Sequence, residues 1–150
     1  AAWLEVPGTV RVAGGATISA RLLRPDATDP TQVARAHGLE WKGASVLLDA
    51  VACGLGELGG RLWVDAPQPG EVMCPLGMHG QSKRLSDLLC DARVPAADRA
   101  GVPVVRTAPS GQVLWVAGIR ADERARCQTT SRLLVELTLY GNDANTQGAR

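Results

Sequence analysis

Residues 102–116 read VPVVRTAPSGQVLWV, in which two valine-rich runs flank a short turn. Branched apolar residues pack well on a pleated sheet, and Pro109-Ser110-Gly111 has the composition of a tight turn. We therefore expect Val104 and Val105 to pair with the run from Val113 to Val116 as an antiparallel hairpin. The stretch thus predicts β-sheet structure in the second half of the chain.

Strand signals continue on both sides of this hairpin. Residues 132–140 form the longest strand candidate, and Gly14-Gly15 separates two β-rich runs as a tight turn does. Residues 46–48 and residues 61–64 are shorter candidates. The apolar positions of these strands are interpreted as core, together with the following two tryptophans: Trp63 and Trp115.

Helical signals are few and short. The strongest begins at Ser82, a good N-cap, and apolar residues spaced as one helix face follow it: Leu85, Leu88, Leu89 and Ala92. Cys90 lies on the apolar side of this predicted helix and is interpreted as a small buried residue. Asp29-Pro30 and Pro95 each predict the start of a shorter helix. Short strands with a few short helices indicate the α+β class, mainly β, and not a doubly wound sheet.

The sequence contains only weak matches to nucleotide-binding and metal-binding motifs. Gly54, Gly56 and Gly59 match the G-x-G-x-x-G fingerprint, which requires a helix directly after the glycines. A strand pattern follows instead, so these glycines are interpreted as turn residues. The four cysteines stand 21, 16 and 37 residues apart, without the paired spacing of a zinc site. We therefore expect no catalytic site, no metal site and no cofactor in this chain.

Length and composition fit one compact domain. The chain has 150 residues, of which 45% are hydrophobic and 21% charged, and this balance excludes disorder of the whole chain. Residues 26–75 carry seven acidic and three basic side chains, whereas residues 76–150 carry seven acidic and ten basic ones. The positive second half favours an anionic partner. No apolar run reaches the ~20 residues of a membrane span and no signal peptide is visible, so we expect a cytoplasmic protein without membrane contact.

The order of short motifs between Pro69 and Arg126 is specific. Along the chain stand Pro69-Gly70-Glu71, Pro75-Leu76-Gly77-Met78, Lys83-Arg84-Leu85, Val94-Pro95, Arg99, Val102-Pro103, Gly118-Ile119-Arg120 and Asp122-Glu123-Arg124. This succession resembles the C-terminal domain of tRNA(Ile)-lysidine synthases over residues 57–139. Residues 1–25 resemble the segment that leads into that domain. The chain departs from the family pattern at Gln68, Glu71 and Val72, where the family has Arg, Asp and frequently Arg.

The resemblance implies a fold and a function. In that family the whole enzyme uses ATP, with Mg, and free lysine to modify the wobble cytidine of a minor isoleucine tRNA. An N-terminal ATP-pyrophosphatase domain carries the chemistry, and this chain lacks it. The C-terminal domain is a tRNA-binding β-sandwich with helices, similar to the B3/B4 region of the phenylalanyl-tRNA synthetase β subunit. The implied partners are tRNA(Ile), the enzyme's own N-terminal catalytic domain and a second copy in a candidate homodimer.

From this resemblance we divide the chain into three segments. Residues 1–56 are a leading segment that packs on or links to the next part, residues 57–140 are the family-like domain, and residues 141–150 are a frayed tail. Basic residues of the second part are the candidates for tRNA contact: Lys83, Arg84, Arg93, Arg99, Arg120, Arg124 and Arg126. Lys83 and Arg84 fall in the first turn of the predicted helix, where the macrodipole disfavours cations, so a phosphate is expected nearby. The alternative is two solvated charges offset by Asp87.

Two further alternatives remain open. Arg120, Arg124 and Arg126 flank Asp122 and Glu123, so this loop is either a phosphate site or an internal ion-pair network. The domain as a whole either docks tRNA or is a structural, protein-interaction domain that braces the enzyme's dimer or inter-domain geometry without touching RNA. The missing basic side chains near residues 68–72 and the net charge of +1 favour the brace.

Overall fold

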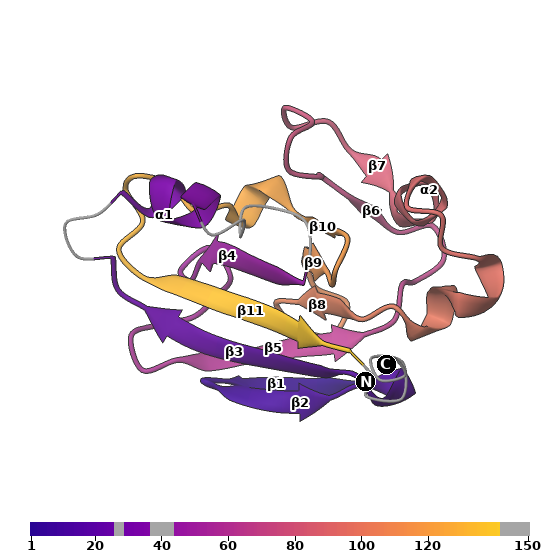
Figure 1. Ribbon diagram of the computed structural model, residues 1–150, viewed down its shortest axis with the longest axis horizontal. Helices are drawn as coiled ribbons and strands as arrows, with labels where there is room; N and C mark the ends of the chain where they lie inside the picture. Colours follow the sequence, from indigo (N-terminus) through magenta and orange to yellow (C-terminus); the bar gives the residue numbers. More distant parts are fainter. Residues whose placement is uncertain (26–28, 37–43, 142–150) are drawn as a thin grey trace.

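The structure is a computed structural model that describes residues 1–25, 29–36 and 44–141. Two antiparallel sheets dominate it, with strand orders β1-β5-β8-β9-β10 and β2-β3-β11-β4 (Figure 1). The first sheet consists of β1 (Ala2–Val6), β5 (Gly60–Asp65), β8 (Val104–Arg106), β9 (Val113–Val116) and β10 (Arg120–Ala121). The second consists of β2 (Gly8–Arg11), β3 (Thr17–Leu23), β11 (Leu134–Tyr140) and β4 (Ser45–Asp49). The mainly β, sandwich-like prediction is confirmed.

The main core lies between these two sheets. Alternate residues of each strand point inward, because successive side chains of a strand face opposite sides. The first sheet contributes Leu4, Leu62, Val105 and Trp115, and the second contributes Ile18, Val46, Val135 and Leu137. Strand pairing joins segments that are far apart in the sequence: β1 pairs with β5, and β11 pairs with both β3 and β4. Residues on either side of position 56 therefore share both sheets.

A second core covers the outer face of the first sheet. Helix α2 (Leu85–Asp91) and strand β6 (Val72–Met73) bring Met73, Leu85, Leu88 and Leu89 onto β8 and β9. The residues that they cover are Val104, Val113 and Val116. Strands β8 and β9 are thus buried on both faces, as their uninterrupted valine runs predict. This packing places α2 and β6 beside the end of the sandwich that holds β10 (Figure 1).

Most of the predicted strands and turns are confirmed. The hairpin of residues 104–116 forms with Val105 opposite Trp115. Gly14-Gly15 turns the chain from β2 into β3, with Gly14 at a φ of 84° that favours glycine. The glycines of residues 54–60 lead into β5 and not into a helix. Asp29 accepts a hydrogen bond from the backbone N–H of Thr31 and so caps α1 (Pro30–Ala36) as predicted. A 3₁₀ helix, η2 (Ala96–Gly101), follows Pro95.

The predicted start of the main helix is wrong. Helix α2 begins at Leu85, and its N-cap is Arg84, whose backbone is extended at φ −69° and ψ 142°. Lys83–Arg84 form strand β7, which pairs with Val72–Met73 of β6. This pairing holds the backbone in the extended form, and the Leu85 N–H donates to Glu71 O, so no helical turn forms after Ser82. Lys83 and Arg84 therefore do not lie in the first turn of a helix. The helix macrodipole thus gives no reason to expect a phosphate beside them.

Two predictions of burial are also wrong. Cys90 is exposed, because the buried stripe of this short helix consists of Leu85, Leu88 and Leu89 alone. A residue five positions after Leu85 is rotated well away from that stripe. Trp63 is only half-buried: it lies on the outer face of the first sheet, edge-to-face with Trp3 at a centroid distance of 5.0 Å. Trp115 is fully buried, as predicted. The predicted tail over residues 141–150 lies outside the described residues, except for Gly141.

The exposure of Cys90 predicts that its thiol is alkylated faster than the thiols of the other three cysteines. Cys53 and Cys127 are buried, and burial raises the pKa of the Cys53 thiol well above its ordinary value, so little of its reactive thiolate forms. Cys74 is half-buried. Iodoacetamide is expected to modify Cys90 first in the native protein, and Cys90→Ser is expected to remove the fast phase. Mass spectrometry of the alkylated peptides checks this order, and a fast phase that persists in Cys90→Ser would contradict it.

Candidate nucleic-acid interface

Two hollows lie beside α2 and share part of their lining. The outer hollow is lined by Val72, Met78, Ser82, Lys83, Arg84, Asp87, Cys90 and Asp91. The inner hollow has a volume of about 160 Å³ and is lined by Met78, Lys83, Leu88, Asp91, Ala92, Ile119 and Arg120. Met78, Lys83 and Asp91 line both hollows, so the two are neighbours. Together they are called the α2 groove below.

An ion pair between Lys83 and Asp91 stands where the two hollows meet. Lys83 extends from β7 and contacts the carboxylate of Asp91 at the last residue of α2. The Lys83 side chain is 24% exposed, whereas that of Asp91 is 63% exposed. The partner of Lys83 is thus Asp91 and not Asp87, because Lys83 lies in a strand and does not share a helix face with Asp87. Asp91 holds the ammonium group in the groove and leaves its own carboxylate facing solvent.

Arg120 reaches the inner hollow from the opposite side. It lies in β10, and its Nη1 donates to the carbonyl oxygen of Leu76 at 3.2 Å. Burial lowers the pKa of Arg120, and the nearby charge of Asp91 acts against that shift. Arg84, the neighbour of Lys83, is exposed on the rim of the outer hollow. The fold therefore brings together three of the seven predicted contact residues, Lys83, Arg84 and Arg120.

Arg124 and Arg126 are held by their own loop. Asp122 is fully buried, and its carboxylate accepts hydrogen bonds from the backbone N–H and the Nε of Arg124, each at 2.9 Å. The Nη2 of Arg124 contacts the second oxygen of Asp122 at 2.7 Å, and these hydrogen bonds raise the pKa of Arg124. Arg126 Nη1 donates to the carbonyl oxygen of Glu123 at 3.2 Å. Both side chains thus help to fix the loop, although Arg124 stays 48% exposed.

The last two predicted residues follow α2 in the chain. Arg93 is exposed and has a φ of 62°. Arg99 lies in η2 and donates from Nε to the carbonyl oxygen of Val94 at 3.1 Å, which closes the turn after the helix. Neither side chain lines the two hollows of the α2 groove.

Sequence reasoning missed a buried ion network beside this region. Arg106 is 1% exposed, and its Nε contacts Asp65 at 2.7 Å. Its Nη atoms contact both carboxylate oxygens of Glu71 and the carbonyl oxygen of Ala66. Burial alone would raise the pKa of Glu71, but hydrogen bonds from Arg106 and from the Gln68 N–H outweigh it and hold the pKa below its ordinary value. The only signal in the sequence was one arginine in a valine-rich strand.

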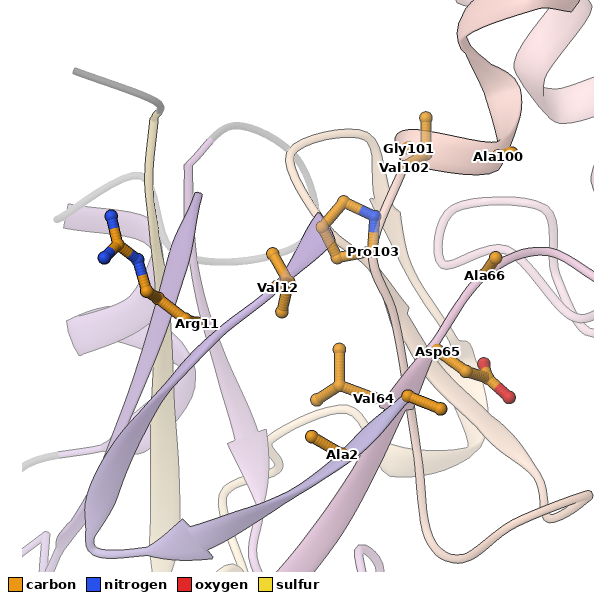
Figure 2. A pocket seen from close by; sticks show the side chains of 11 residues that line it. Ala2, Arg11, Val12, Val64, Asp65, Ala66, Ala100, Gly101, Val102 and Pro103 are labelled. Carbon is orange, nitrogen blue, oxygen red and sulfur yellow. The ribbon is translucent and has the colours of Figure 1, made fainter. Parts of the chain in front are cut away.

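A separate hollow lies beside the paired start of β1 and end of β5, and residues 11–12 and 100–103 complete its lining (Figure 2). It has a volume of about 150 Å³, and small apolar residues such as Val12, Val64 and Pro103 line it. Figure 2 shows the side chains of Arg11 and Asp65 pointing away from its centre. None of the predicted contact residues lines it.

Other kinds of site have little support in the part of the chain that the structure describes. Within residues 1–25, 29–36 and 44–141 there is no group of three or more His, Cys, Asp or Glu side chains that could hold a metal ion. Among the same residues, none of the helices is long and apolar enough to cross a membrane. The glycine fingerprint opens no helix, so these residues do not fit the phosphates of ATP.

Comparison with known proteins agrees with this fold. A family model described as the TilS substrate C-terminal domain matches residues 62–137. A tRNA(Ile)-lysidine synthase of Symbiobacterium thermophilum is 33% identical over 137 residues, which cover 91% of this chain and 25% of that protein. One of Geobacter sulfurreducens is 36% identical over 74 residues, which cover 49% of this chain and 15% of that protein. The chain thus spans a quarter or less of the length of these relatives.

Two solved structures share the architecture. A crystal structure of a TilS C-terminal domain superposes with a TM-score of 0.68 at 20% identity and covers 93% of this chain and 96% of that one. An N-terminal fragment of the phenylalanyl-tRNA synthetase β-subunit from Pyrococcus horikoshii superposes with a TM-score of 0.54 at 18% identity, covering 84% and 38%. The family model spans half of the chain and the structural likeness nearly all of it. The chain therefore belongs to the family of TilS C-terminal domains.

Proposed function

We propose that this chain is the tRNA-binding part of a tRNA(Ile)-lysidine synthase. It holds tRNA(Ile) for a catalytic domain elsewhere in the enzyme, where ATP and lysine are used. The observation that carries the proposal is the gathering of Lys83, Arg84 and Arg120 around one groove. Basic side chains spaced along a groove suit successive phosphates, which position RNA without reading its sequence. The names of the relatives support the same function.

The electrostatics of the groove set the expected strength of binding. Asp91 already neutralises part of the charge of Lys83, and Asp87 lines the same outer hollow. The groove therefore offers a modest positive excess, and we expect weaker binding than that of a strongly basic RNA-binding domain. Such a domain increases the affinity of a larger enzyme for tRNA and orients the bound tRNA.

Removal of the two basic residues of β7 is expected to weaken tRNA binding. Two lost phosphate contacts cost about 1–2 kcal/mol together, or roughly 5- to 30-fold in Kd at 50 mM salt. The measurement is a filter-binding titration of a tRNA(Ile) transcript with the wild-type chain and with Lys83→Ala/Arg84→Ala.

A charge-matched variant serves as the control. Arg11→Ala/Arg24→Ala also removes two exposed positive charges, one at the end of β2 and one just after β3, and neither residue lines the α2 groove. We expect less than a threefold change for this control. Equal losses in the two variants would mean that the groove has no special role. Absence of tRNA binding by the wild-type chain would overturn the proposal and favour a structural brace.

A further inference from the structure

Glu71 links the first sheet to the strand that carries Lys83 and Arg84. Its carboxylate accepts hydrogen bonds from both Nη atoms of Arg106, which lies in β8 and is buried. Its backbone carbonyl oxygen accepts from the N–H of Leu85 at 2.9 Å. Leu85 is the first residue of α2 and directly follows Arg84. One residue is therefore bonded to the sheet through its side chain and to the start of α2 through its backbone.

The two residues after Glu71 extend this link to the proposed tRNA contacts. Val72 pairs with Arg84, and Met73 pairs with Lys83, in the two-stranded sheet of β6 and β7. Met73 is buried in the second core, so β6 is anchored on the outer face of the first sheet. Because β6 is the strand that pairs with β7, the backbone of both basic residues is held through the chain that follows Glu71.

The contacts of Arg106 fix the orientation of the Glu71 carboxylate. A guanidinium and a carboxylate joined by two hydrogen bonds adopt a defined relative geometry. The guanidinium is itself held, because its Nε contacts Asp65 at 2.7 Å and its Nη2 donates to the carbonyl oxygen of Ala66 at 3.1 Å. The carboxylate also accepts from the N–H of Gln68 at 3.0 Å. The position of Glu71 is thus set by β5 and β8.

Glu71 is badly placed to contact RNA itself. Its side chain is 14% exposed, it lines neither hollow of the α2 groove, and a carboxylate repels phosphate. We propose that Glu71, held by Arg106, is a positioning residue for the contact of Lys83 and Arg84 with tRNA. The proposal rests on the tRNA-binding function proposed above and adds to it a residue outside the groove.

The variant Glu71→Gln separates positioning from simple electrostatics, because the two predict opposite changes. If charge alone acted, loss of a carboxylate near the groove would tighten tRNA binding. The glutamine amide group instead places N–H donors against an Nη donor of Arg106, so the two-bond contact is lost and β6 and β7 loosen. We therefore expect about fivefold weaker binding of a tRNA(Ile) transcript in a filter-binding titration at 50 mM salt.

Glu5→Gln is the matched control for this change. Glu5 is an exposed residue of β1 and lines neither hollow, so the same substitution removes a carboxylate without touching the link. The expected change in Kd is less than about twofold, because salt screens exposed charges that lie far from the bound phosphates.

A double-mutant cycle distinguishes positioning from a general loss of structure. Lys83→Ala/Arg84→Ala lacks the side chains that Glu71 positions, so adding Glu71→Gln to it should not weaken binding further. A general loss of structure would weaken binding by the same factor in both backgrounds. Hydrogen exchange measured by mass spectrometry should become faster over residues 72–73 and 83–85 in Glu71→Gln, with β3 and β11 still protected.

A second variant changes the same contact from the side of the sheet. Arg106→Lys keeps the buried positive charge but cannot form the two-bond contact with Glu71. It is expected to weaken tRNA binding in the same direction and to show the same faster exchange over residues 72–73 and 83–85. Thermal unfolding of both variants defines the temperatures at which they are folded, and binding is measured there.

The outcomes separate this inference from the proposed function. Tighter or unchanged binding by Glu71→Gln, or equal losses in the two backgrounds of the cycle, would overturn the positioning role. If wild-type binding still depends on Lys83 and Arg84 in that case, the proposed function stands. Absence of tRNA binding by the wild-type chain would overturn both.

Discussion

Replacement of Asp122 by alanine is expected to lower the free energy of unfolding by about 3–5 kcal/mol. Asp122 is fully buried, and its carboxylate accepts from the backbone N–H of Cys74 at 3.0 Å and from that of Arg124 at 2.9 Å. It also contacts the guanidinium of Arg124. Its removal leaves two N–H groups without their acceptor beside a cavity. It also removes one of the links between residues 72–76 and residues 120–125, which backbone hydrogen bonds from Leu76 N–H to Ala121 O and from Glu123 N–H to Cys74 O still join.

Urea unfolding followed by tryptophan fluorescence measures this loss. Glu123→Ala is the matched control, since it removes the neighbouring carboxylate, which is not fully buried, and is expected to cost less than about 1 kcal/mol. Asp122→Asn keeps one acceptor oxygen and should fall between the two. A free energy of unfolding for Asp122→Ala within about 1 kcal/mol of wild type would show that the carboxylate does not hold the loop.

Replacement of Arg106 by methionine is expected to cost a similar amount, about 3–5 kcal/mol. The long apolar side chain fills much of the same space, but it leaves the carboxylates of Asp65 and Glu71 close together without their shared cation. The network ties β5 and β8 to the loop of residues 66–71, so the loop is expected to open as well. Urea unfolding measures the loss, and limited proteolysis maps the opened segment.

The same network gives the stability a defined pH dependence. The pKa of Glu71 is lower in the folded chain than its ordinary value, so the unfolded chain binds its proton first as the pH falls. The stabilisation by this carboxylate is complete above its ordinary pKa and disappears as the pH falls through the lowered one. Wild type should therefore lose stability between about pH 5 and pH 3, and Arg106→Met should lose less over the same range. Parallel slopes of unfolding free energy against pH in the two proteins would contradict this assignment.

Local sequence patterns were sufficient for most strands of the sandwich, although they did not predict β1 or β10. The valine runs around Pro109-Ser110-Gly111 and the turn at Gly14-Gly15 form as predicted, because their partners are close in the chain. Strand β7 was missed for the opposite reason. Two residues have no periodicity, and their partner strand β6 lies about ten residues upstream. The apolar stripe of α2 was recognised, but its start depended on that unseen pairing.

The candidate site was less predictable than the fold. Lys83, Arg84 and Arg120 were selected from the family resemblance, and no local pattern indicated that β7, α2 and β10 meet around them. The Arg106 network joins residues up to 41 positions apart, so no local window contains it. The sequence left open whether the Arg120–Arg126 loop is a phosphate site or an internal ion-pair network. In the structure the arginines differ: Arg120 lines the inner hollow, whereas Arg124 pairs with buried Asp122.

The salt dependence of tRNA binding tests the central claim most directly. If Lys83, Arg84 and Arg120 each neutralise one phosphate, the logarithm of the binding constant should fall with the logarithm of salt at a slope of about −2 to −3 between 50 and 300 mM. Lys83→Ala/Arg84→Ala should reduce that slope to about −1, because each contact contributes roughly 0.7–0.9. A wild-type slope near zero, or the same slope in both proteins, would contradict a phosphate-binding α2 groove.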